Sequence, residues 1–224
     1  MAQRLVVIGN GMAGARTVEE ILERGGPDHY AITMFGEEPY GNYNRILLSH
    51  VLSGDEDEGG IFLNSLRWYA DNGIELRAGV RVDRIDRFAK VVHADDGSVT
   101  PYDKLVIATG SRPFVPSIDG LYNPRRGFHQ GVFTFRTIDD TRRMVRYARD
   151  HERAVVIGGG LLGLEAARGL QGHGVHVTLV HAGSHLMNAQ LDAQGGAVLR
   201  RSVERLGIAV ELNARTEADR KSVV

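Results

Sequence analysis

The order of apolar and polar residues predicts alternating strands and helices. "RLVVI" at residues 4–8 is an apolar run too short for a helix, and it fits a buried strand of a parallel sheet. Glycines follow, and apolar residues then recur at helical spacing from Met12 to Arg24, where "GGPD" ends the helix. "AITMF" at residues 31–35 predicts the next strand. Together these segments predict a βαβ unit with a right-handed crossover.

The middle of the chain follows a different pattern. Residues 53–60, "SGDEDEGG", predict a surface loop, and "SLRWYADNG" after them predicts a short helix. Alternation then indicates a sheet strand and a small antiparallel meander over about residues 80–103, with a turn at Asp96-Gly97. "KLVIATGSRP" predicts a further buried strand that ends in a turn. Residues 114–136 carry several Pro and Gly and predict a connection between domains.

The same order returns in the second half. "TIDDTRRMVRYARD" predicts an exposed helix, which Thr137 and Asp140 open at the spacing of a capping box. Strands "RAVVI", "HVTLV" and "IAVEL" then alternate with two helices. We therefore expect an α/β fold with two Rossmann-like units of the three-layer ββα/βαβ type, the second inserted into the first and incomplete. The expected domains are residues 1–113 and 137–224, joined by the connection.

Composition excludes several classes of function. The 27 basic and 28 acidic residues leave a formal charge of −1, so nucleic acid and anionic lipid are not expected partners. No apolar run approaches the roughly 18 residues of a membrane span, and the N-terminus lacks a signal peptide, so we expect a cytoplasmic protein. Cysteine is absent, which excludes a redox-active Cys pair and a Cys-held iron–sulfur cluster in these residues. Redox chemistry here requires a borrowed cofactor.

The histidines do not predict a metal site. Two pairs have ligand-like spacing, His173 with His176 and His181 with His185. Because no carboxylate or Cys lies between their members, solvated histidine is the better interpretation.

The motif Gly-x-Gly-x-x-Gly occurs at both strand-to-helix turns. Its glycines are Gly9, Gly11 and Gly14 in the first turn and Gly158, Gly160 and Gly163 in the second. The first glycine permits the tight turn, the second lets a pyrophosphate approach the backbone, and the third lets helix and strand pack closely. The spacer residues of the two motifs are expected at the same sites: Met12, Ala13, Leu161 and Leu162. A single motif also fits a plain tight turn, but two in matching contexts predict two dinucleotide sites.

An acidic residue after the second strand of each unit should bind ribose hydroxyls. In the first unit, Glu37 and Glu38 both stand where that acid is expected. In the second unit, His181 occupies the place where a carboxylate is usual for NAD. A neutral imidazole can bond a ribose hydroxyl, and a protonated one tolerates a 2′-phosphate, so NADH and NADPH both stay open.

Five segments resemble a known family. "VIGNGMAG", "LVIATGSRP" and "VVIGGGLLGLEAA", in this order, resemble FAD-dependent pyridine-nucleotide oxidoreductases of the rubredoxin and ferredoxin reductase branch. "EEPYGNYNRILLSHVLSG" and "LMNAQLDAQGG" are similar to the N-terminal flavoprotein segment of the large subunit of assimilatory NAD(P)H nitrite reductases. The resemblance covers residues 4–214, and it implies a third FAD segment and an interface domain beyond residue 224. The chain is therefore expected to be C-terminally truncated relative to that family.

The resemblance implies FAD on the first unit, with Glu37 at the adenosine half, and NAD(P)H on the second. It places Arg45 and Ser49 near the flavin, Thr109 and Gly110 in a turn that closes over the cofactor, and Glu165 near the nicotinamide. Simpler interpretations stay open: a solvated arginine, a helix cap, a strand-end threonine, and a carboxylate that offsets a helix dipole.

One position departs from that branch, which often has Lys where this chain has His50. Hydride transfer itself needs no side-chain acid or base, and Glu165 and His50 are the candidate catalytic residues. The expected function is hydride transfer from NAD(P)H to FAD, with electrons passed on singly to a separate iron–sulfur or haem-type acceptor. The closest resemblance adds nitrite assimilation as the setting.

Three other functions compete with this one. A non-catalytic nucleotide-binding fragment is the main alternative, because the resemblance puts part of the flavin site outside these residues. A flavin monooxygenase is less favoured, since its Phe-x-Gly…His motif is not visible around "RRGFHQGVF". The absence of Cys excludes a disulfide reductase. Neither the oligomeric state nor the final acceptor is predicted.

Overall fold

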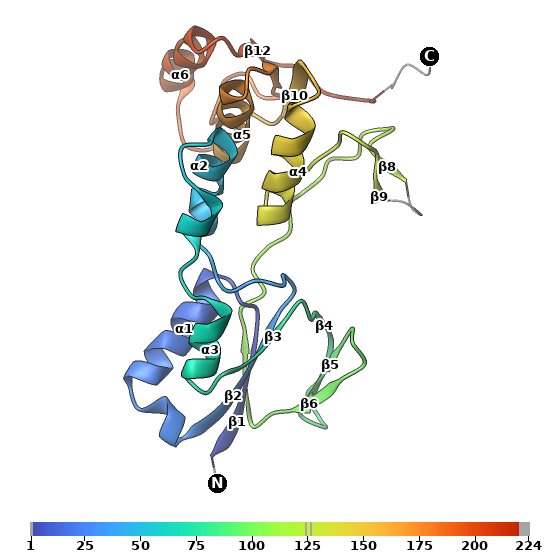
Figure 1. Ribbon diagram of the computed structural model, residues 1–224. Helices are drawn as coiled ribbons and strands as arrows, with labels where there is room; N and C mark the ends of the chain where they lie inside the picture. Colours follow the sequence, from blue (N-terminus) through green and yellow to red (C-terminus); the bar gives the residue numbers. More distant parts are fainter. Residues whose placement is uncertain (1, 124, 126, 220–224) are drawn as a thin grey trace. The chain divides into compact units, whose positions relative to one another are not determined.

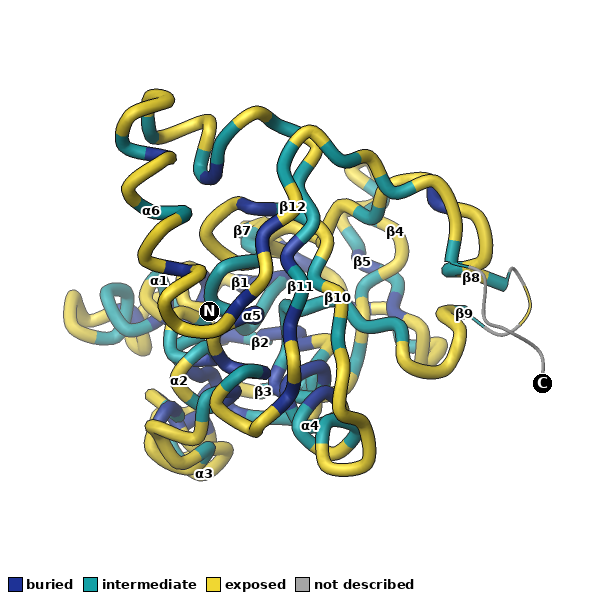
Figure 2. Tube along the Cα trace, turned by 90° about the horizontal axis from the view of Figure 1, so that it is seen from above, coloured by how far each residue is buried: buried dark blue, intermediate teal, exposed yellow. Residues whose placement is uncertain are grey.

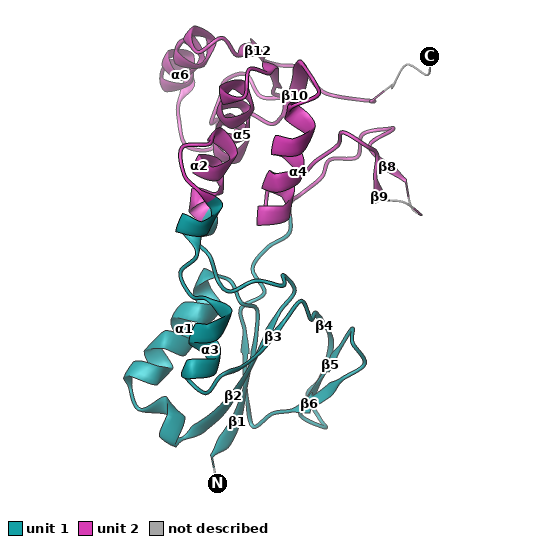
Figure 3. Ribbon diagram, in the orientation of Figure 1, with its two compact units in different colours: residues 1–45, 58–112 teal, residues 46–57, 113–224 magenta. Residues whose placement is uncertain are grey.

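The chain forms two compact units in its computed structural model, which describes residues 2–123, 125 and 127–219 (Figure 3). Unit 1 takes residues 1–45 and 58–112, and unit 2 takes residues 46–57 and 113–224. Each unit has its own sheet and its own hydrophobic core. Residues 46–57 lie inside the first expected domain in sequence, yet they belong to unit 2.

Unit 1 has a four-stranded parallel sheet in the order β3-β2-β1-β7 (Figure 1). Its strands are β1 (Gln3–Ile8), β2 (Tyr30–Gly36), β3 (Glu75–Ala78) and β7 (Lys104–Ile107). Its helices are α1 (Met12–Glu23), α3 (Leu66–Asp71) and the 3-10 turns η1 (Gly26–Asp28) and η3 (Glu58–Ile61). The predicted meander consists of β4 (Val82–Asp86), β5 (Val91–Ala94) and β6 (Val99–Pro101).

The first apolar run is buried on both faces, as expected for a central parallel strand. Leu5 and Val7 belong to the core cluster that also contains residues of α1 and α3. Val6 and Ile8 belong to a second cluster, which contains residues of the meander. This alternation gives unit 1 three layers, with helices on one face of the sheet and the meander on the other (Figure 1).

The expectation that "KLVIATGSRP" begins with a buried strand is wrong in part. β7 pairs with β1 along one side and is the edge strand of the sheet. Leu105 and Val106 are half-buried, and Ile107 is 63% exposed.

Unit 2 has a three-stranded parallel sheet in the order β10-β11-β12. Its strands are β10 (Arg153–Ile157), β11 (His176–Val180) and β12 (Ala209–Glu211), with a small hairpin of β8 (Tyr122–Asn123) and β9 (Gly127–Phe128). Its helices are α2 (Leu48–Ser53), α4 (Ile138–Ala148), α5 (Leu161–Gly172) and α6 (Ala193–Arg205). The short 3-10 turn η2 (Arg45–Leu47) precedes α2 at the point where the chain leaves unit 1.

Helix α4 begins with the predicted capping box. The Thr137 hydroxyl accepts from the Asp140 N–H at 3.0 Å, and the Asp140 carboxylate accepts from the Thr137 N–H at 3.0 Å. The expectation of an exposed helix is wrong for one face, because Ile138, Thr141 and Met144 are buried. Met144 belongs to the core of unit 2.

The first strand of unit 2 is less buried than its counterpart in unit 1 (Figure 2). Val155 and Ile157 are 64% and 43% exposed, whereas Val6 and Ile8, at the same distances from the glycine turn, are 1% and 6% exposed. The cause is local: β7 and the meander cover β1, and the described residues of unit 2 supply no equivalent beside β10.

The predicted α/β class with two Rossmann-like units is confirmed, because both units repeat the strand–helix–strand order with parallel pairing. Among the described residues, no helix is both long and apolar enough to cross a membrane.

Candidate nucleotide-binding sites

The two glycine turns have nearly the same backbone geometry. Gly9 and Gly158 have φ values of 113° and 114°, which lie outside the regions that L side chains readily adopt. The Gly9 N–H donates to the Phe35 carbonyl at 2.9 Å, and the Gly158 N–H donates to the Val180 carbonyl at 2.8 Å. Each turn is therefore held to the end of the neighbouring strand by the same hydrogen bond.

The third glycine of each motif is required for packing. A Cβ on Gly14 would lie 2.0 Å from the Gly9 carbonyl oxygen, and a Cβ on Gly163 would lie 1.9 Å from the Gly158 carbonyl oxygen. Both contacts are with backbone atoms, so no side-chain rotation relieves them. The sequence expectation that helix and strand pack closely here agrees with this geometry.

The second glycine of each motif faces open space. A Cβ on Gly11 or Gly160 would meet no atom within 4 Å. Both residues are the N-caps of their helices, and neither cap has a side-chain hydrogen bond. Uncapped N–H groups at a helix N-terminus favour an anion, and the missing Cβ leaves room for one to approach. The residues at both turns thus fit a dinucleotide diphosphate.

The two glutamates after β2 differ in their surroundings. Glu38 accepts from the Tyr43 hydroxyl at 2.7 Å and from the Arg45 guanidinium at 2.7 Å, and the Arg45 guanidinium also lies 4.9 Å from the centre of the Tyr43 ring. Glu37 is exposed, and its carboxylate makes no hydrogen bond or ion pair with any residue that the structure describes. Of the two carboxylates, that of Glu37 is available to a ligand.

The "ATG" turn lies against the first glycine. The Ala108 N–H donates to the Ile8 carbonyl at 2.8 Å, and a Cβ on Gly9 would lie 2.2 Å from the Ala108 carbonyl oxygen and 3.0 Å from the Thr109 nitrogen. Gly110 follows with a φ of 72°. The backbone of Thr109 therefore lies beside the Gly9 turn. Thr109 and Gly110 are both exposed.

The spacer residues are exposed at both turns. Met12 is 37% exposed and Ala13 is exposed in the first turn, and Leu161 and Leu162 are 57% and 54% exposed in the second. These are the first two residues of α1 and of α5. At the second turn, two large apolar side chains are thus exposed to solvent where α5 begins.

Helix α2 packs closely against α5 within unit 2. Leu52 is fully buried in the core, and a Cβ on Gly169 would lie 2.6 Å from its Cγ. The His173 ring Nε2 donates to the Leu52 carbonyl at 2.6 Å. Ser49, also on α2, has its hydroxyl 3.3 Å from the Ile46 carbonyl, to which it donates.

This packing places the two candidate catalytic residues near enough for their charges to interact. Burial raises the pKa of the Glu165 carboxyl on α5, and the nearby charge of His50 on α2 acts in the opposite direction. His50 is exposed and Glu165 is half-buried. The sequence gives no sign of this interaction, because 115 positions separate the two residues and their proximity depends on how α2 packs.

Sequence reasoning missed a buried polar contact at the first turn. The Tyr69 hydroxyl donates to Asn10 Oδ1 at 2.6 Å, and Asn10 Nδ2 donates to the Tyr40 carbonyl at 3.2 Å. Tyr69 is 1% exposed, and burial raises the pKa of its phenol to about 12. The available signal was the polar residue between the first two glycines of the motif.

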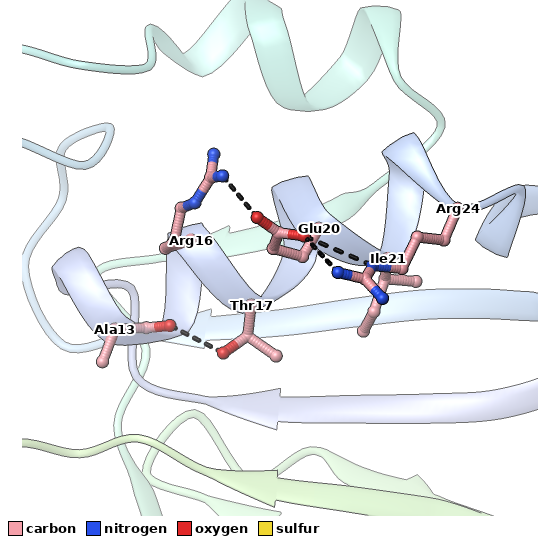
Figure 4. A pocket seen from close by; sticks show the side chains of 6 residues that line it. All are labelled: Ala13, Arg16, Thr17, Glu20, Ile21 and Arg24. Carbon is pink, nitrogen blue, oxygen red and sulfur yellow. Dashed lines mark hydrogen bonds and ion pairs between the residues drawn. The ribbon is translucent and has the colours of Figure 1, made fainter.

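A shallow hollow lies along the outer side of α1 (Figure 4). It is lined by Ala13, Arg16, Thr17, Glu20, Ile21 and Arg24. The Glu20 carboxylate pairs with both Arg16 and Arg24, so the charges of the hollow satisfy one another. Among the described residues, no three His, Asp or Glu side chains are close enough to hold a metal ion.

Comparison with known proteins gives a family and several relatives. The family model described as "Pyridine nucleotide-disulphide oxidoreductase" matches residues 3–223. The chain is 46% identical over 215 residues to Nitrite reductase [NAD(P)H] of Bacillus subtilis (strain 168), covering 96% of this chain and 26% of that protein. It is 32% identical over 216 residues to the biphenyl dioxygenase system ferredoxin–NAD(+) reductase component of Paraburkholderia xenovorans (strain LB400), covering 96% of this chain and 51% of that one.

A solved structure agrees with these relatives. The NADH:rubredoxin oxidoreductase from Clostridium acetobutylicum is 26% identical, with a TM-score of 0.83, over 97% of this chain and 54% of that one. The chain thus spans between a quarter and about half of the lengths of these proteins.

Proposed function

Because the chain belongs to the pyridine nucleotide-disulphide oxidoreductase family, as its motifs predicted, we propose that it is the nucleotide-binding part of an FAD-dependent NAD(P)H oxidoreductase. FAD binds at the first glycine turn and NAD(P)H at the second. The observation that carries this proposal is the pair of uncapped helix starts, where Gly11 and Gly160 leave open space beside free N–H groups. Family members use both cofactors, which supports the assignment of one to each turn.

The residues of the chain bind and orient the two nucleotides. The N-termini of α1 and α5 stabilise the diphosphates, and the carboxylate of Glu37 accepts hydrogen bonds from the ribose hydroxyls of FAD. After β11 the chain reads His181, Ala182 and Gly183, with no carboxylate, so the proposal covers NADH and NADPH alike. A bound flavin would supply the redox chemistry, which is hydride acceptance from reduced nicotinamide and release of electrons one at a time.

Glu165 is proposed to contact the nicotinamide end of the second nucleotide, and His50 is proposed to lie beside the flavin. Since burial raises the pKa of the Glu165 carboxyl, the group holds a proton more readily than an exposed glutamate and can donate or accept a hydrogen bond. His50 offers an exposed imidazole that can donate or accept a hydrogen bond. Arg45 and Ser49 are proposed to lie beside the flavin, with Arg45 oriented by Glu38.

The electron acceptor is proposed to be a separate iron–sulfur or haem-type protein or domain. Two relatives support this class: one carries the name of a ferredoxin reductase, and the other that of a nitrite reductase. Nitrite assimilation is the setting that the higher of the two identities favours.

A spectroscopic experiment tests the proposal. The chain is purified, incubated with FAD, desalted and examined for flavin absorbance, and NADH is then added without oxygen. We expect a yellow protein that bleaches, and an E37Q variant that retains less FAD than wild type. A chain that stays colourless after incubation with FAD would leave only the alternative of a non-catalytic nucleotide-binding fragment.

A further inference from the structure

We propose that His181 is a positioning residue for the second glycine turn: its ring Nδ1 holds the Gly159 amide, and so fixes the turn that receives the NAD(P)H diphosphate. This inference rests on the proposed function of that turn. It differs from the sequence expectation, in which the His181 ring itself faces the ribose.

The first observation is a hydrogen bond from the turn to the ring. The Gly159 N–H donates to His181 Nδ1 at 3.2 Å. Gly159 is the residue between the first two glycines of the motif, and its carbonyl accepts from the Met187 N–H at 2.9 Å. Both polar groups of this peptide position are therefore fixed by residues that follow β11.

The second observation is that the ring is enclosed. A Cβ on Gly159 would lie 2.9 Å from His181 Cγ and 2.6 Å from a methyl group of Leu186, and a Cβ on Gly183 would lie 2.7 Å from His181 Nε2. Nε2 is buried and has no hydrogen-bond partner among the described residues. Because Nδ1 accepts a hydrogen bond, a neutral ring carries its proton on Nε2, packed against Gly183.

The third observation is that unit 1 builds the same turn in the opposite way. Equivalent hydrogen bonds start at Gly9 and Gly158, so Asn10 matches Gly159, and Gly36 matches His181. In unit 1 the side chain is on the turn: Asn10 bonds with Tyr40 and Tyr69, and a Cβ on Gly36 would lie 2.9 Å from Asn10 Cβ.

The exchange of side chains explains the choice of residues. One side chain fits between the turn and the end of the neighbouring strand, and it comes from the turn in unit 1 and from the strand end in unit 2. In both cases it supplies a polar atom that holds the turn in place. Matching by register also places Ala182 opposite Glu37, so the position that offers a free carboxylate in unit 1 is apolar in unit 2.

Three substitutions separate the roles of the two ring nitrogens. Asn places its Oδ1 where His has Nδ1, whereas Gln reaches only toward the position of Nε2, and Ala removes both. The probe is ADP, and the readout is the amide signal of Gly160 in ¹⁵N-labelled chain, which reports on the second turn alone. H176A is the matched control, because His176 is an exposed histidine at the other end of β11.

We expect H181A and H181Q to weaken ADP binding at the second turn by about fivefold to tenfold, the effect of one lost hydrogen bond. H181N and H176A should stay within about threefold of wild type. Wild-type ADP affinity in H181A would overturn the proposal. So would ADP affinity that is retained in H181Q and lost in H181N, because that pattern indicates a contact through Nε2.

A measurement on the wild-type chain covers the case in which a variant does not fold. A ¹⁵N–¹⁵N coupling across the hydrogen bond between the Gly159 amide and His181 Nδ1 is expected, and its absence refutes the contact. If ADP leaves the Gly160 amide of the wild-type chain unmoved, the proposed nucleotide site itself fails. If ADP moves it with equal affinity in wild type, H181A and H181Q, only the role of His181 fails.

Discussion

Alanine substitutions at two neighbouring glycines of the second turn should have opposite effects on stability and binding. Gly160 and Gly163 are separated by one helical turn, yet an added Cβ meets nothing within 4 Å at Gly160 and meets the Gly158 carbonyl oxygen at 1.9 Å at Gly163. The first change fills space that we assign to a ligand. The second fills space that the fold itself occupies.

The geometry sets the expected magnitudes. Ordinary contact begins at 3.4 Å, so G163A requires α5 and the turn to separate by about 1.5 Å, and overpacking of this kind costs about 1–3 kcal/mol. In a chain of this length that lowers the melting temperature by roughly 2–12 °C. Gly160 has a φ of −85° and an extended ψ, which alanine adopts freely, so G160A should change stability by less than about 1 kcal/mol.

G160A, which should hardly change stability, should weaken nucleotide binding. G160A places a methyl group where the diphosphate approaches, and we expect ADP affinity at this turn to fall at least about tenfold in a protein that melts like wild type. Calorimetric melting and ADP titration followed by backbone amide signals measure both quantities. G11A and G14A repeat the pair in the first turn, with FAD as the ligand. Full ADP affinity in G160A, or unchanged melting in G163A, would refute the reasoning.

Three further substitutions test other contacts. Tyr69→Phe leaves the Asn10 amide oxygen without its donor and should lower the free energy of unfolding by about 1 kcal/mol at pH 7. Because the Tyr69 pKa is raised to about 12, wild type should also lose stability above about pH 10, where the unfolded phenol ionises, and the variant should lose less. Urea melts at both pH values measure this. Glu165→Gln should stabilise the chain at pH 7 and have no effect at about pH 3. The reason is that burial raises the pKa of the Glu165 carboxyl, so the unfolded state ionises first as pH rises. Urea melts of wild type and variant at both pH values measure this, and equal stability at pH 7 would contradict it. Gly169→Ala places a Cβ 2.6 Å from Leu52 Cγ and should expose residues 46–57 to limited proteolysis, whereas Gly172→Ala, whose nearest contact is 3.5 Å, should not.

Much of the fold follows from local sequence patterns. Short apolar runs next to glycine motifs identified β1 and β10, helical spacing identified α1, and the repeated strand–helix order identified α5. These elements are set by neighbours close in sequence. The capping box of α4 was predicted for the same reason. The exposure of Ile107 and Val155 was not predicted, because a run of apolar residues does not show whether another strand lies beside it.

The assignment of residues 46–57 to unit 2 was also beyond the sequence. Those residues stand between two segments of unit 1, and their placement depends on Gly169 admitting Leu52 and on the His173 hydrogen bond. Each of these partners is more than 100 positions away. A periodicity argument uses a window of at most a few helical turns, so it has no access to such a contact.

The candidate sites divide in a similar way. Glycine spacing alone predicted both turns, because φ near 114° and a carbonyl within 2.0 Å of a missing Cβ are demands that only glycine meets. The choice between Glu37 and Glu38 required the structure, in which Tyr43 and Arg45 donate hydrogen bonds to the Glu38 carboxylate.

The residue that supports each turn is less constrained than the turn itself. A polar side chain has to hold the peptide between the first two glycines, but it can start from the turn, as Asn10 does, or from the strand end, as His181 does. In each case the opposite position is glycine, because two side chains do not fit in that space. A polar residue at one of these positions therefore requires glycine at the other. Because Gly159 stands on the turn of unit 2, a polar residue such as His181 is expected at the strand end.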